Sequence, residues 1–89
     1  MKLIVAIVRD SDAEAVLSGL VEQRFGVTRI ASTGGFLRRG NTTLWIGTED
    51  TRVEEALNII RLSSTQPSEG SLQRRATVFV LNVARFEQL

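Results

Sequence analysis

The sequence contains no cysteine and no histidine. Without cysteine there is no disulfide and no thiol redox chemistry. Without both residue types the usual zinc sites are excluded, as is acid–base catalysis by histidine. These absences argue against an enzyme and against a resident metal.

The sequence also has no large excess of positive or negative residues, because the formal net charge is only +1. A near-neutral chain does not have the basic footprint of a nucleic-acid-binding protein. The longest aliphatic run near the start, residues 3–8, is too short to cross a bilayer or to form the apolar region of a signal peptide. We therefore expect a cytoplasmic protein with no nucleic-acid partner and no membrane insertion.

The chain of 89 residues predicts one domain, residues 1–89. Its strand-like runs are residues 3–8, 27–33, 42–47 and 76–80, and apolar residues recur at helical spacing over 13–21 and 53–60. The order strand, helix, strand, strand, helix, strand predicts an α+β, ferredoxin-like βαββαβ fold. Right-handed crossovers would place both helices on one face of a four-stranded antiparallel sheet. Three of the strands are rather apolar, so the other face needs a cover, which a second subunit would supply.

Local signals predict how the helices begin and end. Ser11 or Asp12 is expected to cap the first helix, and Gly26 to take the left-handed conformation after it. Residues 51–54, TRVE, match a capping box for the second helix. We expect Trp45, the only tryptophan, to pack between a helix and the sheet.

The most unusual stretch is residues 32–43, STGGFLRRGNTT, between the second and third strands. Consecutive glycines let backbone amides converge on an anion, and two arginines add positive potential. Phe36 offers a flat surface for a ring, and Asn41 can both donate and accept at the edge of a base. Together these features suggest a nucleotide, although neither common phosphate-loop motif is present. The alternative is an ordinary turn, with Phe36 packed in an interface and Asn41 as a turn residue.

Several segments together resemble a known family. They are MKLIVAIV at the start, TGGFLRxGNTT over 33–43, RVEE over 52–55, ATVFVL over 76–81 and FEQL at the end. The sequence resembles the PII-like cyclic-di-AMP receptors, small signal-transduction proteins of bacteria. The resemblance implies a homotrimer that binds one cyclic di-AMP in each cleft between subunits. It also implies no catalysis, no cofactor other than that ligand, and a downstream protein partner that the sequence does not identify.

The resemblance further implies the residues of the site. The backbone of Gly35, Phe36 and Leu37 would hold a phosphate and an adenine, with Asn41 beside them. The remaining contacts it implies are Thr28 in the second strand, Gly47 where the ligand lies close to the backbone, Phe79 in the fourth strand, and Gln88 in the tail.

The chain departs from the family at two places. Family members commonly carry asparagine and arginine where this chain has Arg24 and Gly26, so Arg24 or Arg29 would have to replace the missing cation. The segment over 63–75 is also short for the family. These departures keep two alternatives open: a sensor of another nucleotide (ATP, ADP or a different cyclic dinucleotide), and a structural trimer that has lost its ligand.

Two functions of the same topology fit less well. An acylphosphatase needs a phosphate-holding loop after the first strand, where this chain has residues 9–12, RDSD. An RNA-binding module would need aromatic side chains in its middle strands and a basic platform.

Overall fold

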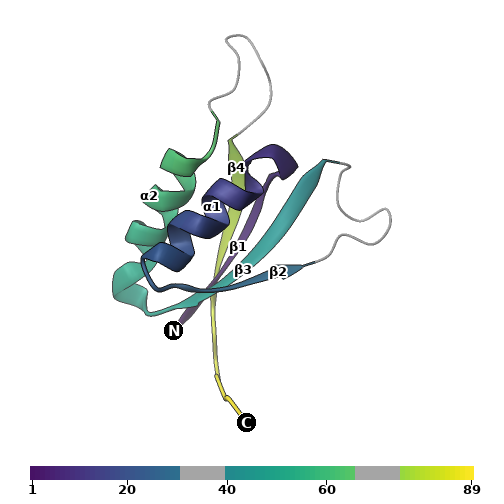
Figure 1. Ribbon diagram of the computed structural model, residues 1–89. Helices are drawn as coiled ribbons and strands as arrows, with labels where there is room; N and C mark the ends of the chain where they lie inside the picture. Colours follow the sequence, from purple (N-terminus) through teal and green to yellow (C-terminus); the bar gives the residue numbers. More distant parts are fainter. Residues whose placement is uncertain (31–39, 66–74) are drawn as a thin grey trace.

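The computed structural model describes residues 1–30, 40–65 and 75–89. Within these ranges the chain forms four strands, two α-helices and a short 3₁₀ turn (Figure 1). In chain order they are β1 (Lys2–Arg9), α1 (Asp10–Glu22), β2 (Gly26–Ile30), β3 (Asn41–Thr48), η1 (Asp50–Arg52), α2 (Val53–Ser63) and β4 (Ala76–Asn82). The end of the predicted second strand, residues 31–33, lies outside the described residues.

The four strands form one sheet in the order β2-β3-β1-β4, and each neighbouring pair is antiparallel. Both helices lie on the same face of this sheet (Figure 1). This arrangement confirms the predicted α+β, βαββαβ fold. β1 lies between β3 and β4, so the first strand of the sequence is central in the sheet.

The core lies between the helices and one face of the sheet. β1 turns Ile4, Ala6 and Val8 toward the helices, and each is at most 1% exposed. The other buried apolar residues of the core are Ala13, Val16, Leu20, Phe25, Leu44, Ile46, Ala56 and Ile60. Gly19 lets α1 approach α2 closely, because a Cβ there would lie 3.0 Å from Cγ2 of Ile59.

We call the opposite face of the sheet the open face, because neither of the two described helices lies over it (Figure 1). Trp45, Phe79 and Leu81 belong to this face and are 45%, 53% and 48% exposed. The prediction that Trp45 packs between a helix and the sheet is therefore wrong. Successive side chains of a strand point to opposite faces. Because Leu44 and Ile46 are buried under the helices, Trp45 between them has to lie on the open face.

The left-handed residue after α1 is Arg24, with a φ of 67°, so the prediction for Gly26 is wrong. The amide of Arg24 donates to the carbonyl of Val21 at 2.9 Å, and the amide of Phe25 donates to the carbonyl of Leu20 at 3.0 Å. These two bonds form the Schellman ending of a helix, in which the left-handed position is Arg24. The helix ends before Gly26 because Gly26 is already the first residue of β2.

The predicted N-caps are also wrong. α1 begins at Asp10 directly after β1, so Ser11 and Asp12 lie inside the helix. α2 begins at Val53, with Arg52 in the capping position and without a side-chain cap among the described contacts. The predicted capping box over 51–54 does not form. The Arg52 guanidinium instead bonds both carboxylate oxygens of Glu55, at 3.0 and 3.1 Å.

The left-handed arginine leads to a prediction about stability. A residue with a Cβ pays roughly 1–2 kcal/mol in the left-handed region, and glycine does not. We expect Arg24→Gly to raise the free energy of unfolding by about 1 kcal/mol, measured by urea denaturation at a fixed protein concentration. Arg24→Ala is the matched control, because it removes the arginine side chain but keeps the strain. Equal stabilities of the two variants would contradict this explanation.

Candidate functional site

The central candidates Gly35, Phe36 and Leu37 lie outside the described residues. The residues that flank them on the sheet are Ile30 at the end of β2 and Asn41 at the start of β3. The placement of the other five candidates is visible, and it decides which of them one copy of the chain brings together.

Thr28 and Phe79 belong to one row of residues across the open face. In the strand register Thr28 faces Trp45, Trp45 faces Val5, and Val5 faces Phe79. The row runs from one edge strand, β2, to the other, β4. Three strand spacings separate Thr28 from Phe79, a distance of about 14 Å.

Asn41 and Gly47 share β3 and, by its alternation, the open face. Asn41 faces Arg9 at one end of the strand pair, and Gly47 faces Leu3 near the other end. Six residues of strand separate them by about 20 Å. The structure therefore does not gather Asn41, Gly47, Thr28 and Phe79 into one small site within a single copy.

Gln88 lies in the tail after β4. The tail leaves the sheet at the end where Lys2 pairs with Thr48 and Asn82, and it runs away from the body of the domain (Figure 1). This is the end of the sheet that holds Gly47, whereas Asn41 lies at the opposite end.

Two glycines leave the backbone of the open face without side chains. Gly26 faces Gly47 directly across β2 and β3. Among the described residues, nothing lies within 4 Å of a Cβ built at either position. The backbone is thus accessible at Gly47, where a close ligand is expected, and the missing arginine of position 26 would have stood immediately beside it.

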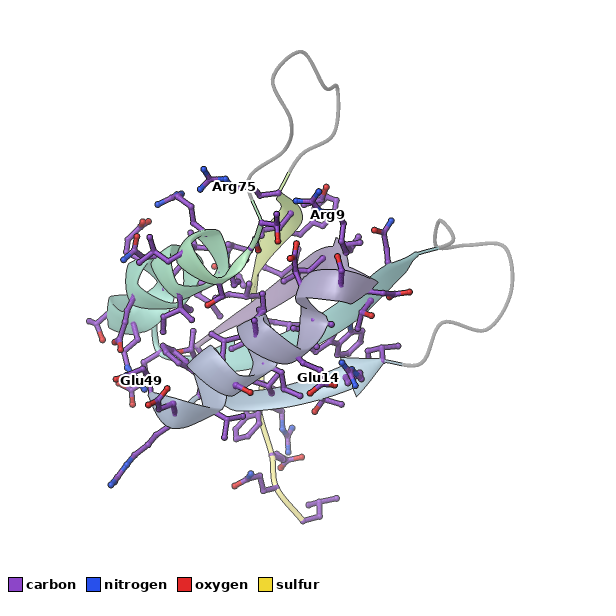
Figure 2. The ribbon with its side chains drawn as sticks, turned by 45° about the horizontal axis from the view of Figure 1, so that its top comes forward. Arg9, Glu14, Glu49 and Arg75 are labelled. Atoms are coloured by element: carbon purple, nitrogen blue, oxygen red, sulfur yellow. The ribbon has the colours of Figure 1, made fainter. Side chains whose placement is uncertain are left out.

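Arg29 does not replace that arginine. Its Nη2 lies 2.9 Å from the Glu14 carboxylate of α1. Figure 2 shows Glu14 on α1, above β2 on the face that the helices cover. Arg29 alternates with Thr28 along β2, so the two side chains belong to opposite faces of the sheet.

The exit of the glycine-rich segment is anchored to the start of α1. The amide of Asp10 donates to the carbonyl of Gly40 at 2.7 Å, and the hydroxyl of Thr42 donates to the Asp10 carboxylate at 2.6 Å. Gly40 has a φ of 89°, which only glycine adopts without strain. The chain therefore enters β3 with Asn41 at a defined position beside the helix.

A second anchor joins the same turn of α1 to the residues that follow α2. The Thr65 hydroxyl donates to the Asp12 carboxylate at 2.6 Å, and Arg9 Nε lies 3.3 Å from the other Asp12 oxygen. Arg9 also donates to the carbonyl of Thr65. In Figure 2, Arg9 lies at the same end of the sheet as Arg75, which precedes β4. Gly40, which precedes β3, and Thr65, which follows α2, are thus both bonded to the first turn of α1.

Asp12 is only 3% exposed and remains charged. Burial alone would raise the pKa of its carboxyl group. Hydrogen bonds from the hydroxyl and the backbone amide of Thr65, together with the charge of Arg9, outweigh burial and lower the pKa below its ordinary value. The sequence predicted this residue as a cap, and no local signal identified a partner 53 positions away.

Arg52 was also missed by the sequence analysis. Its guanidinium lies 4.0 Å from the ring centre of Phe25 and donates to the carbonyl of Gln23 at 2.9 Å. It therefore ties the start of α2 to the turn between α1 and β2. These contacts lie at the end of the sheet opposite Asn41.

The described residues offer little for metal chemistry or membrane insertion. In residues 1–30, 40–65 and 75–89, no three acidic side chains come together as a metal site would require. No helix in the described part of the chain has the length and apolar character needed to cross a membrane.

Comparison with known proteins identifies the family. The model of the family described as "Cyclic-di-AMP receptor" matches residues 1–69, which include β1 to α2 and the glycine-rich segment. The chain belongs to the cyclic-di-AMP receptor family. This confirms the resemblance and gives the nucleotide as the ligand of the family.

A solved structure supports the fold over the whole length. It is a functionally unknown protein from Pediococcus pentosaceus ATCC 25745, with 39% sequence identity and a TM-score of 0.80. The alignment covers 99% of this chain and 96% of that one. The two chains therefore match over nearly their whole lengths.

The buried carboxylate leads to a prediction about pH. Asp12→Asn keeps the shape but removes the charge that Arg9 and Thr65 surround. We expect the free energy of unfolding at pH 7 to fall by about 1–3 kcal/mol. Since the folded state lowers the pKa of Asp12, this contribution is complete at neutral pH and is lost as the pH falls through the folded value. The gap between wild type and variant should therefore narrow below about pH 4.

The matched control is Glu14→Gln, the same change at an exposed residue of the same helix. An exposed ion pair contributes little, so this variant should unfold like the wild type. Denaturant unfolding at neutral and acidic pH checks both variants. An Asp12→Asn protein as stable as wild type at pH 7 would show that the anchor does not stabilise the fold.

Proposed function

We propose that this protein is a non-catalytic, cytoplasmic receptor that binds cyclic di-AMP in the clefts between subunits of a homotrimer and passes the signal to a protein partner. One observation carries the position of the site: the candidate residues lie on the open face at opposite edges and ends of the sheet. These residues lie about 14–20 Å apart within one copy. One ligand contacts them more easily if two copies of the chain each contribute the residues at one edge of their sheet. Family membership carries the identity of the ligand.

The open face supports an assembly because it is apolar. Leu81 and Phe79 leave about half of their surface in water, and a second copy would bury them. The C-terminal tail, which extends from the body in Figure 1, contains Gln88 and Phe86, and Phe86 is 57% exposed. A tail that leaves its own domain in this way can reach the site of a neighbour.

The available chemistry suits binding. Cyclic di-AMP presents two anionic phosphates and two adenine rings. The Asn41 amide can both donate to and accept from an adenine edge, and the accessible backbone at Gly47 lets the ligand approach closely. Neither contact transfers a proton or forms a covalent bond, as expected of a non-catalytic receptor.

A second candidate is favoured by one observation. Position 26 is a glycine where members of the family commonly carry arginine, and Arg29 is paired with Glu14 on the other face of the sheet. A site with less positive charge fits a sensor whose preferred nucleotide is not cyclic di-AMP, such as another cyclic dinucleotide or an adenine nucleotide. Titrations with several nucleotides in parallel separate the two candidates.

Isothermal titration calorimetry of the purified protein should give about one cyclic di-AMP per subunit, with weaker or no binding of cyclic di-GMP, ATP and AMP. Asn41→Ala should raise the dissociation constant about tenfold or more, because it removes hydrogen bonds to the base. Asn58→Ala makes the same change on the exposed surface of α2 and should bind like wild type.

Each outcome of these titrations has a distinct meaning. Equal binding by the Asn41 and Asn58 variants would show that the site is misplaced. Selective binding of a different nucleotide would support the second candidate. A folded trimer that binds none of the four would be the structural protein that has lost its ligand.

The assembly can be tested independently of the ligand. Leu81→Glu places a charge on the open face, and we expect it to convert the trimer to monomers in light scattering coupled to size-exclusion chromatography. Leu62→Glu is the matched control, because Leu62 is 75% exposed on α2 and lies away from the open face. A trimer that survives Leu81→Glu, or a wild-type monomer, would contradict this assembly.

A further inference from the structure

Trp45 occupies a position for which the family resemblance assigned no role. It faces Thr28 directly across β2 and β3. Gly47 follows two residues later on the same strand and belongs to the same face. Two residues expected to touch the ligand are thus its immediate neighbours on the sheet.

On the open face, Trp45 is a large side chain beside two glycines. The indole is the largest side chain of the sheet, yet 45% of its surface is exposed. Beside it on the sheet lie Gly26 and Gly47, which have no side chain, and among the described residues nothing lies within 4 Å of a Cβ built at either one. A large aromatic side chain therefore lies beside a stretch of backbone that has no side chains.

A planar ring fits the space between the indole and the backbone of the two glycines better than a charged group does. An aromatic side chain stacks on any base, because every base has a π-face. The backbone at Gly26 and Gly47 offers no side chain that could select among bases. We propose that Trp45 stacks on one ring of the bound cyclic dinucleotide, with the ring lying over Gly26 and Gly47. This inference rests on the proposed function, since it adds a contact to the same site.

The chemistry of stacking has two consequences. Trp45 contributes affinity that is similar for adenine and guanine rings, so it is not the residue that selects the base. Its contribution depends little on salt, because stacking involves no ion pair with phosphate.

The intrinsic fluorescence of the protein provides a direct test, because Trp45 is its only tryptophan. Titration of the wild-type protein with cyclic di-AMP should quench or shift the indole emission, with the same midpoint as the heat measured by calorimetry. Trp45→Leu should raise the dissociation constants for cyclic di-AMP and for any measurable cyclic di-GMP binding by a similar factor, about tenfold. Trp45→Phe keeps a ring and should recover most of the affinity.

Several outcomes would overturn the stacking contact while the receptor stands. Unchanged emission on saturation, or equal affinity of Trp45→Leu and wild type, would remove Trp45 from the site. Emission that changes when the protein is diluted, but not when ligand is added, would show that a neighbouring copy covers the indole. In both cases the wild-type calorimetric heat remains. A wild-type protein that gives no heat with cyclic di-AMP would instead overturn the proposed function and this inference together.

Discussion

The structure depends on one constraint: the handedness of its crossovers places both helices on the same face of the sheet. The helices bury Ile4, Ala6 and Val8 of the central strand completely, and this contact supplies most of the core. The same strand presents Leu3, Val5 and Ile7 to the open face by alternation, where neither described helix covers them. The fold is thus complete on one side and incomplete on the other, where apolar side chains such as Phe79 and Leu81 are exposed. The candidate ligand residues of the sheet all belong to that incomplete side.

The sequence predicted the fold well because the fold is carried by repeated local patterns. Alternating or continuous apolar runs located the strands, and helical spacing located α1 and α2. Patterns of this kind depend on neighbours within a few positions, and each strand in the structure extends only slightly beyond its predicted range wherever the chain is described. The order of elements then left few topologies to consider.

The predictions that failed concern residues whose partners are distant in the sequence. Asp12 looked like a helix cap, but Thr65 and Arg9 bind it. Gly26 looked like a helix terminator, but its pairing with Gly47 in the sheet requires the helix to end earlier, at the cost of a left-handed Arg24. Trp45 looked like a core residue by its apolar character, although the alternation of β3 assigns it to the open face. The site residues of the sheet were identified by resemblance, and only the register shows how far apart they lie.

The position of β4 has a consequence for solubility. β4 is an edge of the described sheet, and its stretch ATVFVL has no charge, proline or glycine. An uncovered edge strand of this kind is a template for pairing with other chains, and short uncharged β-prone segments are the usual starting points of aggregation. A polypeptide released from the ribosome carries this hazard until the edge is shielded. Contact with another chain along this edge would therefore protect the protein from aggregation, whether or not a ligand is bound.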